Sequence, residues 1–117
     1  MSNLSDLLPA GAGGKQVNFV ATGTIGNGVT VALNSDGTVT AVGGGNLSSF
    51  IGISDAAISS GASGSVTIKG GISSNVTSLT PNSNYYVQTN GTLSTTTSTE
   101  LAGRALSSTS INLDYTT

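Results

Sequence analysis

Glycine-containing turns interrupt this chain so often that little room is left for a long helix. The 117 residues include 17 Gly, and pairs of Asn or Asp with Gly occur at Asn27-Gly28, Asp36-Gly37 and Asn90-Gly91. Ser and Thr are abundant between the turns; their hydroxyl groups compete with helical hydrogen bonds, and Thr favours strands. We therefore expect an all-β fold, a small β-barrel or β-sandwich of short strands, in one domain with a modest core.

Alternating apolar and polar residues mark the strands between these turns. The clearest hairpin runs through residues 29–41 around Asp36-Gly37, a pair typical of a type I′ turn. A second hairpin is expected at residues 85–93 around Asn90-Gly91, and Gly52 is expected to mark a bulge or a close backbone approach. Other strands are predicted at residues 16–24, 50–53, 66–68, 102–106 and 110–115, with Ile72 and Val76 extending the sheet.

The first 16 residues are expected to form an extended arm that precedes a single β domain at residues 17–117. Leu4, Leu7 and Leu8 form a small apolar cluster, and the glycine-rich run 11–14 that follows Pro9 is too flexible for a strand. We hypothesise that this cluster, together with Phe19, contacts a partner. A frayed terminus or a short helical turn packed on its own domain is the alternative.

Two parts of the chain have similar sequence patterns, and we call this similarity the echo. Residues 31–40 and 85–94 share a hairpin pattern, and each is followed by a strand with a central glycine, at 51–53 and 102–105. The echo favours two similar β units. Hairpins built with the same turn chemistry also look alike by chance, so both interpretations stand at this level.

The small number of ionisable side chains excludes several classes of function. Charged residues make up 7% of the chain, the formal net charge is -2, and His and Cys are absent. The absence of His and Cys excludes the catalytic triads of serine and cysteine hydrolases, and it excludes metal sites built from His or Cys. Three Lys and Arg side chains are too few to form a nucleic-acid interface. Asp36 belongs to a turn and Glu100 to a Thr-rich loop, so neither resembles half of a catalytic pair. We expect no enzyme activity, cofactor or metal.

No stretch approaches the ~20 apolar residues needed to cross a bilayer, and the N-terminus lacks a basic region. We therefore expect neither secretion nor a membrane partner.

Several segments together resemble virion proteins of tailed phages. They are Leu7 to Lys15, Asn34 to Val39, Leu79-Thr80-Pro81, Tyr85-Tyr86-Val87, Asn90 to Thr96 and Ala102 to Ser107. In such proteins, similar segments occur as repeat modules of tail fibres and as small stand-alone head decoration (cement) proteins, and the short chain favours the second. The pattern departs at Asn82, where glycine is common, and at Asn90, where aspartate is common.

The resemblance implies a role for the whole chain and transfers no individual residue function. It implies a β-barrel or β-sandwich, often a trimer, on the outer capsid surface of a bacteriophage after synthesis in the host cytoplasm. The expected partners are the major capsid protein and other copies of the chain, with a trimer favoured. The alternative is a tail-fibre or adhesin module whose loops, such as Thr95 to Thr99, bind the host surface.

Overall fold

The computed structural model describes residues 16–43, 45–68 and 70–113, and their fold is all-β, as expected. The apolar cluster of the predicted arm lies outside these residues. A short 3-10 turn, η1 (Leu47–Ser49), precedes the fourth strand. The strands are β1 (Gln16–Val20), β2 (Thr30–Leu33), β3 (Val39–Ala41), β4 (Phe50–Ser54), β5 (Ser63–Ile68), β6 (Ile72–Ser73), β7 (Asn84–Val87), β8 (Leu93–Ser94), β9 (Glu100–Ala105) and β10 (Ile111–Leu113).

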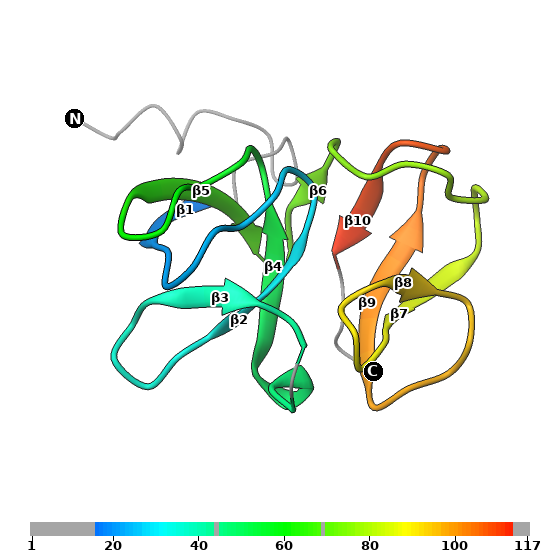
Figure 1. The fold of residues 1–117 in the computed structure, drawn as a ribbon. Coiled ribbons are helices and arrows are strands. Elements are labelled where there is room, and N and C mark those ends of the chain that lie inside the picture. Colours follow the sequence, from blue (N-terminus) through cyan, green and yellow to red (C-terminus); the bar gives the residue numbers. More distant parts are fainter. Residues whose placement is uncertain (1–15, 44, 69, 114–117) are drawn as a thin grey trace.

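The strands form two five-stranded antiparallel sheets that lie side by side (Figure 1). The order is β1-β5-β4-β2-β3 in the first sheet and β6-β10-β9-β7-β8 in the second. Numbered from its own first strand, each sheet has the order 1-5-4-2-3. The echo in the sequence therefore reflects an internal duplication, and we call residues 16–68 the first repeat and residues 72–113 the second repeat.

The pairing irregularities are duplicated as well. In the first repeat Val31 faces Gly52 and Ala32 faces Phe50, so the pairing register shifts by one residue in β4. In the second repeat Tyr85 faces Gly103 and Tyr86 faces Leu101, which is the same shift of one residue in β9. Both repeats thus place a β-bulge at the same point of the sheet.

The expected close backbone approach at Gly52 is present. A Cβ atom added there would lie 2.1 Å from the carbonyl oxygen of Thr67 on the neighbouring strand. Only glycine leaves room for the two strands at this point.

The two hairpins have the same type of turn, which differs from the type predicted from the sequence. In each, a three-residue loop is closed by backbone hydrogen bonds, Asn34 N to Thr38 O in the first repeat and Gln88 N to Thr92 O in the second. Only the glycine of each loop has a positive φ, 88° at Gly37 and 89° at Gly91. A type I′ turn needs two such residues, so the predicted type I′ turn at Asp36-Gly37 is wrong. The loop is instead a type I turn followed by a left-handed glycine.

The residues just before β2 and β7 also have the same backbone conformation. This conformation explains why asparagine occupies position 82. Gly28 has φ 71° and Asn82 has φ 72°, and the two N–H groups donate to Ser54 O and Ala105 O respectively. Ser54 and Ala105 occupy equivalent positions in β4 and β9. Asn82 therefore fills a left-handed position that suits glycine, and Asn is the side chain that tolerates such a position best.

Each sheet has an inner face, covered by the loop of its own repeat, and an outer face. On the first sheet, Val31, Val39 and Val66 point inward, where they pack with the loop residues Ala21 and Ile25. On the second sheet, the inner residues Tyr85, Val87, Ala105, Ile111 and Leu113 pack with Val76 and Leu79 of the loop.

The outer face of the first sheet packs into the hydrophobic core of the second repeat. Ala32, Phe50 and Ile53 belong to the same buried cluster as the inner residues of the second sheet. The two repeats therefore pack head to tail, the outer face of one on the inner face of the next.

Two predicted strands end differently from expectation. The strand expected at residues 16–24 stops at Val20, because Ala21 turns inward to bridge Val39 and the chain continues as the loop over the inner face. Ile72 opens β6 of the second sheet, whereas Val76 lies in the following loop and contributes to the core.

Candidate functional site: the pocket between the repeats

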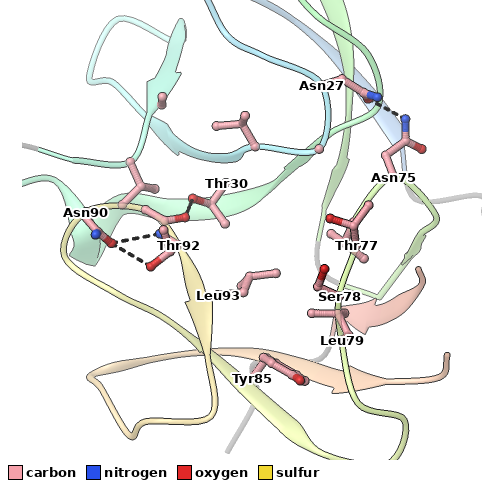
Figure 2. A pocket seen from close by; sticks show the side chains of 16 residues that line it. Asn27, Thr30, Asn75, Thr77, Ser78, Leu79, Tyr85, Asn90, Thr92 and Leu93 are labelled. Carbon is pink, nitrogen blue, oxygen red and sulfur yellow. Dashed lines mark hydrogen bonds between the residues drawn. The ribbon is translucent and has the colours of Figure 1, made fainter. Parts of the chain in front are cut away.

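A pocket of about 650 Å³ lies where the two repeats meet (Figure 2). The first repeat contributes the loop before β2, the start of β2 and the end of β3. The second repeat contributes the loop before β7 and the β7–β8 hairpin. The lining residues are Asn27, Gly28, Val29, Thr30, Ala41, Val42, Asn75, Val76, Thr77, Ser78, Leu79, Tyr85, Asn90, Gly91, Thr92 and Leu93.

One hydrogen bond joins the repeats beside this pocket. The buried hydroxyl of Thr30 donates to the carbonyl oxygen of Gly91 over 2.6 Å. The backbone of Gly91 also presses on the first repeat, since a Cβ atom there would lie 2.5 Å from the carbonyl oxygen of Val42. The second hairpin is thus held against the first repeat by a backbone contact that only glycine permits.

A second link is made by Asn75, on the opposite side of the pocket. Its amide nitrogen donates to Asn27 Oδ1 and to Asp55 O, each over 2.6 Å. The carboxylate of Asp55 in turn accepts hydrogen bonds from the hydroxyl groups of Ser65 and Thr67 on β5. Asn75 therefore ties the second repeat to a polar network anchored on the first sheet.

The pocket is lined without Asp, Glu, Lys or Arg, and much of its polar surface is already engaged. Tyr85 accepts a hydrogen bond at its hydroxyl from Thr80 N, and Asn90 Oδ1 accepts two, from the N–H and the hydroxyl of Thr92. No group of three or more His, Cys, Asp or Glu side chains occurs in the part of the chain that the structure describes. These contacts are typical of a junction between packed units.

Two carboxyl groups outside the pocket have shifted pKa values. The hydroxyl and N–H of Thr38 hold the pKa of Asp36 below its usual value. Partial burial raises the pKa of Glu100. The shifts are opposite in sign, and both follow from local structure near the ends of strands.

The predicted contact residues are placed only in part. Leu4, Leu7 and Leu8 lie outside the described residues. Phe19 lies on β1 and packs, half-buried, against the core of the first repeat.

The loop 95–99 is tied to its own sheet. Thr96 O accepts a hydrogen bond from Gln88 Nε2, and the hydroxyl of Ser98 donates to Val87 O.

Sequence reasoning did not single out Thr30, Asn75 or Gly91 as contacts between repeats. The Asn90-Gly91 pair carried a signal, but that signal concerned the hairpin turn. Their shared role depends on how one repeat is placed on the other, which no local pattern specifies.

Exposed apolar side chains gather mainly on the first repeat. Val17 is 39% exposed, Val20 42% and Leu33 39%, and Leu106 of the second repeat is 51% exposed. Val17 and Val20 lie on β1, which is an edge strand. Across residues 16–43, 45–68 and 70–113, no helix is long and apolar enough to cross a membrane.

Comparison with known proteins gives no match: neither a family model nor a curated protein nor a solved structure is similar to this chain.

Proposed function

We propose that this chain is a structural protein of a bacteriophage particle that binds the outer capsid surface and reinforces the contacts between major capsid subunits. The sequence resemblance to decoration proteins is the starting point. The proposal involves no catalytic step. Its physical basis is that a protein bound across neighbouring subunits must be displaced before those subunits separate, which adds its binding free energy to the stability of the shell.

The observation that carries the proposal is the edge strand β1. It pairs with β5 over five residues, from Gln16 opposite Thr67 to Val20 opposite Ser63, and leaves its other edge at the margin of the sheet. Its sequence contains no charge and no proline, and Val17 and Val20 are exposed. Proteins usually protect such an edge with charges, prolines or bulges, so an unprotected edge favours a binding role.

The low content of charged residues, 7% of the chain, supports the same role. Moving charged groups out of water is costly when a large interface forms, and neutral hydroxyl groups reduce this cost. We include Leu4, Leu7 and Leu8, which precede β1 in the sequence, as an apolar tether, together with Phe19 of β1.

Deletion of residues 1–14 tests the tether. The truncated chain should fold, as judged by circular dichroism, and should fail to attach to capsids that lack the native protein. Undiminished occupancy would refute the tether.

A matched pair of substitutions tests the edge strand. Val20→Asp should reduce occupancy by at least tenfold, whereas Leu106→Asp, an equally drastic change outside β1, should not. Equal occupancy of the two variants would count against β1 as the capsid contact.

The alternative is a tail-fibre or adhesin module that binds the host surface. The pocket between the repeats favours it, because a concave site with apolar side chains and no charged residues suits neutral ligands such as sugars. Quantitative mass spectrometry of purified particles separates the two functions. Hundreds of copies per particle would indicate the head, whereas a few copies, located on the tail, would favour the alternative.

A further inference from the structure

The two repeats show how one unit of this fold binds another. The outer face of the first sheet, with Ala32, Phe50 and Ile53, packs on the inner face of the second sheet beside Val87 and Ala105. The faces in contact are different, so the arrangement is head to tail and has no two-fold symmetry. Within residues 16–43, 45–68 and 70–113, such an arrangement leaves one face of each kind without a neighbouring repeat.

The free face at one end is the outer face of the second sheet. The strand pairing of the two sheets shows which residues are equivalent. Tyr86 corresponds to Ala32, Leu101 corresponds to Phe50, and Arg104 corresponds to Ile53. Neither hydrophobic core includes Tyr86 or Leu101, and both side chains are partly exposed.

The corresponding face at the other end is the inner face of the first sheet, which the loop of its own repeat covers only in part. Leu33 is the equivalent of Val87, yet Val87 is fully buried between the repeats whereas Leu33 is 39% exposed. Val29, Ile51 and Ile68, which pack against the core of the first repeat, are likewise only partly buried. The apolar surface that the second repeat covers with a neighbouring unit is therefore partly open in the first repeat.

The two residues that form the hydrogen bond between the repeats have equivalents at these two faces, one of which, Asn84, accepts a hydrogen bond at Oδ1 from Arg104 Nε. Asn84 occupies the position of Thr30, and Gly37 occupies that of Gly91. A Cβ atom at Gly91 would collide with Val42 O, but one at Gly37 would meet nothing within 4 Å. The first hairpin thus has the same turn as the second, with room beside its glycine for the backbone of a neighbouring unit.

We propose that a second copy of this chain docks in the same way, with the outer face of its second sheet on the inner face of the first sheet of its neighbour. Tyr86 and Leu101 would then pack beside Leu33, and the Asn84 amide would donate to the carbonyl oxygen of Gly37. The inference concerns contacts between copies and does not depend on capsid binding.

The contact between copies is weaker than the one within the chain. Polar Tyr86 and charged Arg104 stand where Ala32 and Ile53 are fully buried in the first repeat. Burying a charge or an unpaired polar group costs free energy that the apolar side chains do not incur. The association is therefore reversible and depends on protein concentration, unlike the covalently linked pair of repeats.

Single cysteines introduced into this cysteine-free chain test the geometry. Leu33→Cys and Tyr86→Cys variants, mixed and treated with a short bismaleimide, should give a covalent dimer. Either variant alone should give little, because unlike faces meet. The matched control replaces Leu33→Cys with Val20→Cys, an equally exposed position outside both docking faces. A yield no higher than this control, or efficient cross-linking of Tyr86→Cys with itself, would overturn the proposal.

Sedimentation measurements provide a second test that needs no cross-linker. The wild-type chain should form larger species as concentration rises, and Leu33→Asp should shift this association to at least tenfold higher concentration. Val20→Asp, on the outer face of the first sheet and so outside both docking faces, should behave like the wild type. Thermal unfolding of each variant establishes that the fold is intact. A wild-type chain that stays monomeric, or a Leu33→Asp variant that associates normally, would contradict the inference.

Discussion

The hydroxyl of Thr30 donates a 2.6 Å hydrogen bond to the carbonyl oxygen of Gly91, 61 residues further along the chain. This bond joins the first strand of one hairpin to the turn of the other and crosses the boundary between the two repeats. Thr30 is only 2% exposed, so little water competes for the bond. It makes the packing of the repeats directly accessible to mutation.

Thr30→Val should destabilise the chain by about 1–2 kcal/mol. Valine has a similar shape but leaves the carbonyl oxygen of Gly91 without this donor in a partly buried position. Urea unfolding provides the measurement. The exposed Thr22→Val, which removes hydroxyl contacts within the first repeat only, should cost less than about 0.5 kcal/mol. Equal effects of the two variants would contradict a special role for the bond between repeats.

Gly91→Ala and Gly37→Ala form a matched pair that isolates the close approach of the two repeats. Both glycines have nearly the same φ, 89° and 88°, so alanine should cost about 1 kcal/mol at each for the left-handed backbone. Only at Gly91 would the new methyl group meet a backbone oxygen, that of Val42. We expect at least about 2 kcal/mol of further loss there. Unfolding at low protein concentration, where copies do not associate, should show this difference; similar losses would rule out a tight contact.

Gly28→Ala and Asn82→Ala test equivalent positions whose surroundings differ. At Asn82, alanine should cost about 1 kcal/mol and glycine should be nearly neutral, because only the positive φ matters. At Gly28, a Cβ atom would lie 2.1 Å from the carbonyl oxygen of Asn75, so alanine should cost much more. Thermal unfolding of the three variants provides the comparison, and an Asn82→Ala loss as large as that of Gly28→Ala would be inconsistent with it.

Glu100→Gln should raise stability slightly at pH 7 and leave it unchanged near pH 3. Burial raises the folded-state pKa of Glu100, so its favourable contribution is complete below the unfolded pKa and is lost as pH rises through the folded pKa. Glutamine removes the cost of keeping a charge there, by less than about 1 kcal/mol for a partly exposed group. Thermal unfolding across pH 3–7 measures the effect; a gain that is independent of pH would exclude this cause.

Asp36→Asn should change stability with pH in the opposite direction to Glu100→Gln. The Thr38 hydrogen bonds lower the folded-state pKa of Asp36, so its contribution is present above the unfolded pKa and is lost as pH falls through the folded pKa. The variant should therefore melt at a lower temperature at pH 7 and should approach the wild type in acid. The second repeat carries asparagine at the equivalent position, Asn90, with the same contacts to Thr92, which shows that the turn itself accepts the substitution.

The sequence by itself determined the local structure of this protein. Alternation in residues 29–41 and 85–93 specified two hairpins because side chains on a strand point to opposite faces in turn. The glycine at position 52 indicated a close strand approach, and the absence of His and Cys excluded whole classes of chemistry. The echo between residues 31–40 and 85–94 left duplication and chance likeness open, and the matching strand orders of the two sheets decided for duplication.

Only the tertiary structure decided how the repeats are arranged and which residues join them. The sheet order, the head-to-tail packing and the contacts of Thr30, Asn75 and Gly91 all involve residues far apart in the chain. The turn type also followed from the observed φ values, since an Asp-Gly pair suits more than one hairpin loop. The physical reason is the same throughout: a local pattern determines which face of a strand is apolar, but many partners could cover that face, and the choice depends on packing over the whole molecule.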